Sequence, residues 1–336
     1  MIERVILGFY EDEANMNVQG TVTKGKSAVR DDQYWNHLKR RIWRARHIYL
    51  MLLPGLLWYL IFAYFPMGGL TLAFRDFRPN LGILRSPWVG FQVFEYVLRD
   101  PRFFASIRTT LEINIMRLII QFPFPIILAL ALNEVRLGRL KKIFQTIYTF
   151  PNFLSWIIIS GVLINFLGGN GFVNSTLNMM GQDSVNFLGS SSLFRPLLYA
   201  TAMWAHSGWG AIIYLAAIAG IDTEQYEAAE IDGASRLQRL RFITLPGLSS
   251  TIIVMFILAC GNLMTAGFDQ IFNLSNPAVI GVAETIDMYI YRITFMAAAD
   301  FSFSTAVALV RSILNLIFLL LCNSIIKKLS GSGLFA

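Results

Sequence analysis

The sequence predicts an all-α membrane protein with six transmembrane helices and both termini in the cytoplasm. Three observations support this prediction: the composition, the number of long apolar stretches, and the placement of Lys and Arg in the short loops. Apolar residues make up 55% of the 336 residues and charged residues 15%, against about 25% charged residues in an average soluble domain. The mean hydropathy is +0.54. We therefore expect membrane lipid to surround most of the chain.

Six apolar stretches have about the 20 residues that a helix needs to cross a bilayer. The predicted spans are residues 48–73, 109–133, 146–167, 196–220, 249–268 and 303–326. The region 278–299 is also apolar, but Glu284, Asp287 and Arg292 interrupt it. Because charged side chains are costly inside lipid, an interfacial or re-entrant helix is the better prediction there than a seventh span.

The positively charged residues of the short loops predict the orientation. The segment before the first span, "NHLKRRIWRARH", holds five Lys or Arg residues, and "EVRLGRLKK", between the second and third spans, holds four. Three arginines lie between the fourth and fifth spans, and two lysines follow the sixth. Loops rich in Lys and Arg stay in the cytoplasm, so this side and both termini are assigned to it. Six arginines within residues 75–108, on the opposite side, argue against this orientation but are outnumbered.

This topology divides the chain into a polar and basic cytoplasmic tail (1–47), a transmembrane domain (48–326) and a short cytoplasmic tail (327–336). The first tail contains "GTVTKGKS", which has the phosphate-loop pattern at Gly20, Gly25, Lys26 and Ser27. A phosphate loop needs a buried strand before it and a helix behind it. The flanking segments, "EDEANMNVQ" and "AVRDDQYWN", offer neither, so we expect no ATP binding there.

The loop between the fourth and fifth spans, "GIDTEQYEAAEIDGASRLQRLRFITLPGL", predicts two short helices joined by a bend. Asp222 can cap the first helix, and Gly233 can end it because glycine adopts a left-handed conformation readily. Ser235 and Gln238 have the spacing of a capping box for the second helix. Pro246 suits the first turn of the next span. Small residues and exposed glutamates favour an elbow that docks on another protein, and an ordinary solvated loop is the alternative.

The same loop carries a longer motif: E-A-A, three residues, G, nine residues, and I-x-L-P. This pattern is similar to the signature of permease subunits of bacterial binding-protein-dependent ABC importers. The residues at its defined positions are Glu227, Ala228, Ala229, Gly233, Ile243, Leu245 and Pro246. The likeness covers most of the chain after residue 48. Residues 88–111 resemble the sugar-importing branch, and residues 267–295 the subgroup for polysaccharides and complex oligosaccharides, where the chain looks most like the first permease subunit of alginate importers.

The resemblance implies a type I ABC importer permease of the bacterial inner membrane. In that family the loop, here residues 221–246, is a coupling helix in a groove of the ATPase, so Glu227 is expected to face the ATPase and Gly233 to set the bend. The implied partners are a second, different permease subunit, two ATP-binding subunits that hold ATP and Mg²⁺, and an extracytoplasmic solute-binding protein. The implied cargo is an oligo- or polysaccharide, acidic glycans such as alginate included, moved by alternating access. The chain itself is expected to hold no cofactor.

Polar residues within the apolar spans mark the expected sugar pathway, because such residues are costly in lipid. Asn262 and Asp269 are seven residues apart, about two helical turns, and share one helix face. A sugar site needs aromatic faces, amides and charges, and an acidic glycan also needs cations. The candidate pathway residues are Trp204, Asn262, Asp269 and Arg311. Arg311 has the alternative of pairing with a carboxylate inside the bundle, and Trp204 that of a packing residue.

The sequence argues against catalysis, metal binding and nucleic-acid binding by this chain. Its three histidines are scattered, its two cysteines lie in apolar runs, and no catalytic or metal-binding pattern appears. The cytoplasmic loops account for the net charge of +7. A proton-coupled secondary sugar transporter is the alternative function, since intramembrane carboxylates can couple to protons. Six spans without a repeated half argue against it, and a non-transporting membrane partner would need no polar groups in its spans.

Overall fold

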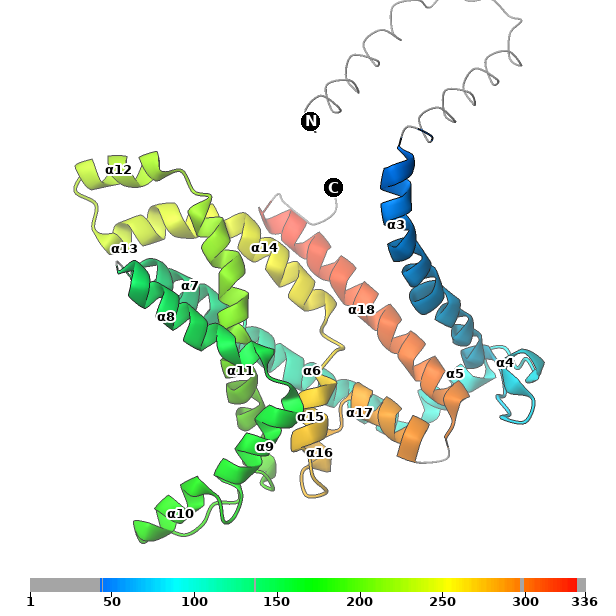
Figure 1. Ribbon diagram of the computed structural model, residues 1–336. Helices are drawn as coiled ribbons and strands as arrows, with labels where there is room; N and C mark the ends of the chain where they lie inside the picture. Colours follow the sequence, from blue (N-terminus) through cyan, green and yellow to red (C-terminus); the bar gives the residue numbers. More distant parts are fainter. Residues whose placement is uncertain (1–42, 44, 136, 297–298, 331–336) are drawn as a thin grey trace, which may run out of the picture. The chain divides into compact units, whose positions relative to one another are not determined.

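The computed structural model describes residues 43, 45–135, 137–296 and 299–330. These residues are almost entirely helical (Figure 1), apart from loops and an isolated bridge between Arg75 and Trp88. The chain divides into two compact units, residues 1–68 and 69–336. The described part of the first unit consists of α3 (Arg46–Tyr59), η1 (Leu60–Tyr64) and the beginning of η2 (Phe65–Phe74).

The second unit holds the remaining helices. Its first half contains α4 (Gly82–Arg85), α5 (Gln92–Arg99), α6 (Pro101–Ile120), α7 (Pro123–Asn133), α8 (Gly138–Thr149), η3 (Phe150–Phe153), α9 (Trp156–Leu167) and α10 (Phe172–Met179). Its second half contains α11 (Ser191–Ala219), α12 (Thr223–Ile231), α13 (Arg236–Arg239), η4 (Leu240–Thr244), α14 (Leu245–Gly261), α15 (Phe268–Leu274), α16 (Ile280–Ala283), α17 (Ile286–Tyr291), η5 (Arg292–Met296) and α18 (Phe301–Ser330).

Six helical stretches of the described chain are long and apolar enough to cross a membrane, as predicted. They are Arg46–Phe74, Pro101–Asn133, Trp156–Met179, Ser191–Ala219, Arg236–Gly261 and Phe301–Lys328. Large apolar side chains remain exposed on them, such as Ile157 and Ile158 of α9 and Leu316 of α18. Lipid is the solvent that such a surface requires. The described residues of the region 278–299 form only the short α16, α17 and η5, in keeping with the prediction that this region is not a seventh span.

Three of the predicted spans are interrupted where the sequence predicts continuous helix. The second is divided between α6 and α7 just before Pro123, and the third into α8, η3 and α9, with Ser155 capping α9. The fifth ends at Gly261 instead of residue 268. Proline lacks the N–H that continues a helix, which explains the first two interruptions. Hydropathy alone does not show them, because the residues around the interruptions are also apolar.

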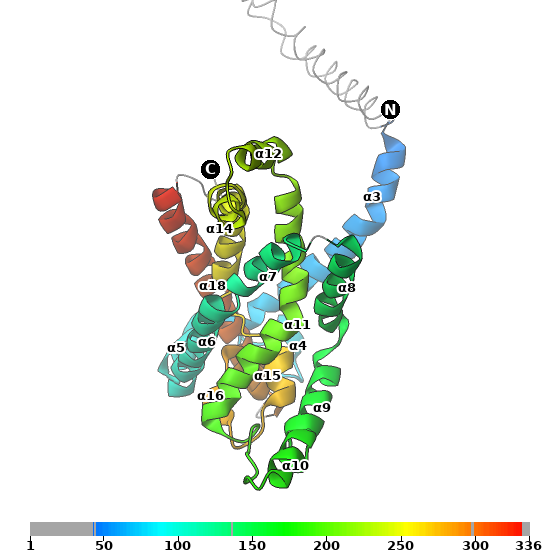
Figure 2. The same cartoon turned by 90° about the vertical axis from the view of Figure 1, so that its left-hand side faces the viewer.

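The helix α11 is the centre of the second unit. Its residues Ala211, Tyr214 and Ile218 pack in one buried cluster with side chains of α7 and with Leu248 of α14. Gly208 lies directly against the backbone of Tyr148 at the end of α8, where a Cβ atom would collide with the carbonyl group. Packing around α11 therefore fixes the helices that lead into the loop containing α12 and α13 (Figure 2).

Candidate functional site: the elbow and the interrupted fifth span

The first helix of the elbow, which we define as residues 221–246, begins and ends as the sequence predicts. The Asp222 carboxylate accepts a hydrogen bond from the Glu224 N–H at 3.0 Å and caps α12. Gly233 has φ +74°, the left-handed conformation that ends the helix. The N–H of Ala234 then donates to the Ala229 carbonyl at 2.8 Å. The bend is therefore closed by local backbone bonds.

The second helix of the elbow begins with a complete capping box. The Gln238 side chain accepts from the Ser235 N–H at 2.7 Å, and the Ser235 hydroxyl accepts from the Gln238 N–H at 3.4 Å. Arg239 and Glu230 form an ion pair of 3.0 Å between the two helices. The hydroxyls of Tyr226 and Thr244 lie 3.0 Å apart. These contacts tie the elbow to the start of the fifth span.

The prediction of a separate second helix followed by a new span at Pro246 was wrong in one respect. The helix is continuous from Arg236 to Gly261 and passes through η4, a single π-helical turn just before Pro246. A π turn shifts the hydrogen-bond register by one residue. It therefore lets the helix continue past a proline that offers no N–H.

The elbow exposes apolar side chains away from the bundle. Ile231 is 87% exposed, Leu237 73% and Phe242 69%. Glu227 and Gly233 are exposed beside them. Figures 1 and 2 place α12 at the opposite end of the second unit from α10. By the predicted topology this is the cytoplasmic end, and large exposed apolar side chains next to charges are typical of a protein-binding surface.

The fifth span breaks off at residues 262–267, where the backbone leaves the helix before α15 begins. Side chains of α6 satisfy part of this backbone. The Asn114 amide donates to the Leu263 carbonyl at 2.7 Å, and the Arg117 guanidinium donates to the Ala266 carbonyl. A second nitrogen of Arg117 donates to the Gln270 side chain at 2.6 Å. Irregular backbone within a membrane protein needs such internal partners because lipid supplies none.

Side chains of α18 satisfy the other side of the break. The Asn315 side chain accepts from the Met264 N–H at 2.9 Å, and Arg311 donates to the Met264 carbonyl at 3.0 Å. Arg311 also donates to the Thr265 hydroxyl at 3.0 Å and forms an ion pair of 2.6 Å with Asp287 of α17. Burial raises the pKa of Asp287, and the charge of Arg311 opposes this. Arg311 thus joins three elements, which is the internal pairing considered as its alternative role.

The four candidate pathway residues do not gather in one place. Asn262 lines a cavity of about 310 Å³ between α6 and the break, together with Asn114, Arg117 and Gln121. That cavity is not lined by Trp204, Asp269 or Arg311. Trp204 is half exposed on α11, and Asp269 lies in the first turn of α15. The structure therefore brings Asn262 of the predicted set to this cavity and does not bring the other three candidates to it.

The pathway candidates chosen from the sequence do not include three polar residues in or directly after α6 that line this cavity. Asn114, Arg117 and Gln121 are spaced by three and four residues, so they share one face of a helix. That spacing was a usable signal. The partners of Asn114 and Arg117, however, lie about 150 positions later in the chain, and that of Gln121 lies 78 positions later. No local pattern indicates them.

The arginines that argued against the predicted orientation have carboxylate partners. Four of the six form ion pairs with nearby acids: Arg78 with Asp76 at 2.9 Å, Arg99 with Glu95 at 3.9 Å, Arg102 with Asp100 at 3.4 Å, and Arg108 with Glu112 at 2.7 Å. Partial burial acts to raise the pKa of Asp100, but hydrogen bonds from Tyr289 and Arg102 outweigh it and hold the pKa below its usual value. The positive charge of this side is therefore largely neutralised.

Two further predictions state that the chain binds no metal ion and that its phosphate-loop pattern binds no ATP. Among the described residues, no group of three or more His, Cys, Asp or Glu side chains is placed to hold a metal ion. The phosphate-loop pattern at Gly20–Ser27 and most of both predicted tails lie outside the described residues.

The part of the chain that contains the elbow and the break matches a known protein family. Residues 121–331 match the family described as "Binding-protein-dependent transport system inner membrane component". The chain belongs to this family. The permease is 42% identical to Protein LplB of Bacillus subtilis (strain 168) over 89% of this chain and 92% of LplB. It is 41% identical to the polygalacturonan/rhamnogalacturonan transport system permease protein YteP of the same organism, over 87% of this chain and 91% of YteP.

Solved structures show the same architecture. A crystal structure of a bacterial ABC transporter involved in the import of the acidic polysaccharide alginate contains a chain 35% identical to this permease, with a TM-score of 0.79. The match covers 88% of this permease and 99% of that chain. A second structure, 34% identical with a TM-score of 0.78, holds the alginate transporter in complex with an alginate pentasaccharide-bound periplasmic protein.

These findings settle the class of the protein. It is a multi-pass permease of the bacterial inner membrane with the ABC importer permease fold, and its relatives are transport subunits rather than enzymes. The proton-coupled secondary transporter is not favoured, because the matched family works with binding proteins.

Proposed function

We propose that this permease is one of two different membrane subunits of an ATP-driven importer of oligo- or polysaccharides. Two ATP-binding subunits would bind ATP and Mg²⁺ at the cytoplasmic end, and a solute-binding protein would deliver the saccharide at the other end. Support for the saccharide comes from the names of the relatives, which include a polygalacturonan/rhamnogalacturonan permease and an alginate transporter. Both names refer to acidic glycans, so the proposed cargo is a glycan chain that contains acidic units.

The exposed elbow is the observation that carries the proposal. Its apolar side chains Ile231, Leu237 and Phe242 have no burial partner in the described chain that covers them. An ATPase groove that received α12 would bury them, and the Glu227 carboxylate would meet basic groups there. The remaining coupling residues are Ala228, Ala229, Gly233, Ile243, Leu245 and Pro246. Because the elbow is joined rigidly to α14 through Tyr226 and Thr244, closure of the ATPases would move the fifth span and switch access.

We further propose that the saccharide passes along the polar surface at the break. Asn262 and the cavity it lines offer amides and a guanidinium to sugar hydroxyls and carboxylates. Asp269 and Trp204 would contact the sugar elsewhere along its path, outside this cavity. Arg311 would act chiefly by holding the break, because its nitrogens already bind Met264, Thr265 and Asp287.

The coupling role is tested with Gly233→Asp in the purified complex with its ATPase subunits and binding protein. Asp tolerates the left-handed conformation better than most residues, so the bend is retained while a charged side chain enters the docking surface. We expect loss of ATPase assembly and of substrate-stimulated ATP hydrolysis. Gly181→Asp is the matched control, since Gly181 also has positive φ and open space around it but lies beyond α10, at the other end. Full activity of Gly233→Asp would contradict the proposal.

The acidic cargo is tested separately by transport. Reconstituted importer is compared with charged and neutral oligosaccharides, in the wild type and in Asn262→Ala and Arg311→Gln. We expect uptake of the charged oligosaccharide in the wild type and a selective loss of it in Asn262→Ala. Arg311→Gln is expected to reduce uptake of both sugars equally, because Arg311 acts by holding the break. Equal losses for both sugars in Asn262→Ala would assign a purely structural role to Asn262.

A further inference from the structure

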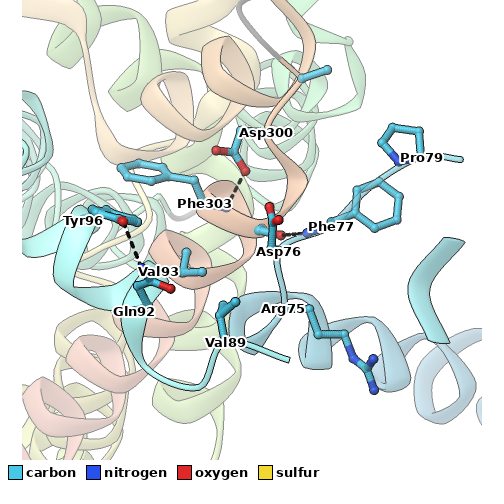
Figure 3. Close-up of a pocket in the computed structure, with 12 residues that line it drawn as sticks. Arg75, Asp76, Phe77, Pro79, Val89, Gln92, Val93, Tyr96, Asp300 and Phe303 are labelled. Carbon is cyan, nitrogen blue, oxygen red and sulfur yellow. Dashed lines mark hydrogen bonds between the residues drawn. The ribbon is translucent and has the colours of Figure 1, made fainter. Parts of the chain in front are cut away.

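A pocket of about 560 Å³ opens between the segment that follows η2, the helix α5 and the start of α18 (Figure 3). Its volume lies in the range of small-molecule sites, roughly 300–1,000 Å³. By the predicted topology it lies at the extracytoplasmic end, away from the elbow, and none of its lining residues lines the cavity at the break. The pathway proposed above uses none of its residues.

Hydrogen bonds hold the walls of this pocket in place. The Phe77 N–H donates to the Ser302 hydroxyl at 3.0 Å, which joins the segment after η2 to α18. On α5, the Gln92 amide donates to the Tyr96 hydroxyl at 3.1 Å. The same helix is anchored by Val93 and Val97, which are buried in the apolar core. The pocket is therefore formed before any ligand arrives.

Asp300 supplies an acceptor that has no ion-pair partner in the described part of the chain. Its Oδ1 accepts the Phe303 N–H at 2.9 Å and caps α18, whereas the ion pairs among the described residues do not include it. Figure 3 shows Asp300 and Asp76 directed to the same space, with the rings of Tyr96 and Phe303 on one side and Phe77 on the other. Tyr96 accepts from Gln92 and keeps its own proton for donation.

The charges around the pocket favour a neutral ligand over a cation. Asp76 is already paired with Arg78 at 2.9 Å. Arg75 lines the pocket but directs its guanidinium to the carbonyls of Leu84 and Ser86. Acceptors and a phenol beside aromatic rings suit a ligand with several hydroxyl groups and an apolar ring face. A Lys or Arg side chain would gain little here, because Arg78, paired with Asp76, and Arg75, which lines the pocket, together match the two negative charges of Asp76 and Asp300.

We propose that this pocket binds a neutral sugar unit of an oligosaccharide at the extracytoplasmic rim of the permease. The hydroxyls of the sugar would donate to Asp300 and accept from Tyr96, and its ring would lie against Phe303. The proposal rests on the saccharide function proposed above and adds a second site outside the spans. Such a site would hold one end of a mixed glycan chain near the entrance.

The simplest alternative is that Asp300 only caps α18, and Asp300→Asn distinguishes the two roles. Asn caps a helix about as well as Asp, so the variant keeps the fold and removes the charge that binds hydroxyl groups. Tyr96→Phe removes one donor and keeps the ring. Glu95→Gln is the matched control, because it neutralises a carboxylate on the same helix that does not line the pocket.

The experiment measures saccharide binding to the complete importer complex in nanodiscs, without nucleotide and without binding protein, by saturation-transfer difference NMR. The probes are maltotriose, trigalacturonate and the tripeptide Gly-Lys-Gly. We expect maltotriose to bind, with its Kd raised about tenfold by Asp300→Asn, since hydrogen bonds to a charged group are about twice as strong as neutral ones. Tyr96→Phe is expected to raise the Kd about threefold through the loss of one hydrogen bond, and Glu95→Gln to leave it unchanged.

Three results would overturn the proposal: no binding of maltotriose, binding that Asp300→Asn leaves unchanged, or binding of the lysine peptide in place of the sugar. The last result would identify the pocket as an anchor for a protein partner. Because these measurements use neither ATP nor the elbow, a failure here is separate from a failure of Gly233→Asp to uncouple ATP hydrolysis.

Discussion

The elbow and the break in the fifth span are both irregular segments with a positive-φ glycine, yet opposite kinds of contact hold them. In the elbow the bonds join residues close in sequence, such as Asp222 with Glu224 and Ser235 with Gln238. At the break the bonds reach from α6 and α18, and Arg117 is about 150 positions from its acceptors. The first segment is specified locally, and the second exists only within the assembled bundle.

This difference agrees with the proposed roles of the two segments. A segment that docks on another chain must keep its shape while its surface is exposed, and local capping bonds allow that. A break within the spans must instead be enclosed by partners, since an unsatisfied backbone group in lipid costs several kcal/mol. Substitutions that remove equivalent groups from the two segments therefore measure how much stability local bonds give the elbow and distant partners give the break.

The largest effect is expected for Arg117→Met. This change leaves the Ala266 carbonyl and the Gln270 side chain without their donor inside the bundle. We expect the free energy of unfolding to fall by about 3 kcal/mol, within the range for buried groups that lose a charged partner. Thermal unfolding of the complex in detergent measures it.

Arg239→Met in the elbow is the matched comparison for Arg117→Met. Its ion pair with Glu230 is largely exposed on the Glu230 side, so we expect a loss of at most about 0.5 kcal/mol. Equal losses for the two variants would show that the break does not depend on distant partners in the way described.

The two glycines give the second comparison. Gly267 has φ +70°, and a Cβ there would lie 3.2 Å from the Arg117 guanidinium, whereas Gly233 has φ +74° and open space. A left-handed Ala costs about 1 kcal/mol at either position. We expect Gly233→Ala to show only that loss of stability and Gly267→Ala to lose about 2 kcal/mol, because Arg117 is also displaced. Urea unfolding of both variants tests this, and a smaller loss for Gly267→Ala would contradict it.

A smaller effect on stability is expected for the caps of the elbow. Asp222→Ala and Ser235→Ala each remove one capping acceptor and should cost about 1 kcal/mol of local helix stability. The helices are short and exposed, so the melting temperature of the whole complex should hardly change. The expected readout is faster amide hydrogen exchange in α12 or α13 and weaker stimulation of ATP hydrolysis. Unchanged exchange in both variants would show that the caps are dispensable.

The smallest effect is expected for Tyr226→Phe, which removes the hydroxyl contact with Thr244. One neutral hydrogen bond contributes about 1 kcal/mol or less. We expect normal assembly of the complex with a reduced ratio of transport to ATP hydrolysis, because this contact ties α12 to the fifth span. A normal ratio would place the transmission of movement elsewhere in the elbow.

The same contrast explains which structural predictions succeeded. The number of spans, the caps of the elbow and the left-handed Gly233 depend on composition or on neighbours within a few residues, and they agree with the structure. The interruptions before Pro123 and after Gly261, and the continuous helix across Pro246, depend on which partners the backbone finds. Hydropathy reports only whether a segment prefers lipid, so it does not contain this information.

The sequence by itself determined that the chain crosses the membrane six times and carries a bent, capped loop, because apolar length and local hydrogen bonds are properties of short segments. Only the tertiary structure decided what the intramembrane charges do. It gave Arg311 an Asp287 partner, assigned Arg117 to the break, and paired four of the six arginines within residues 75–108 with acids. The physical reason is that a charge in a membrane protein is stabilised by the groups that surround it in space, and for the break these groups come from distant helices.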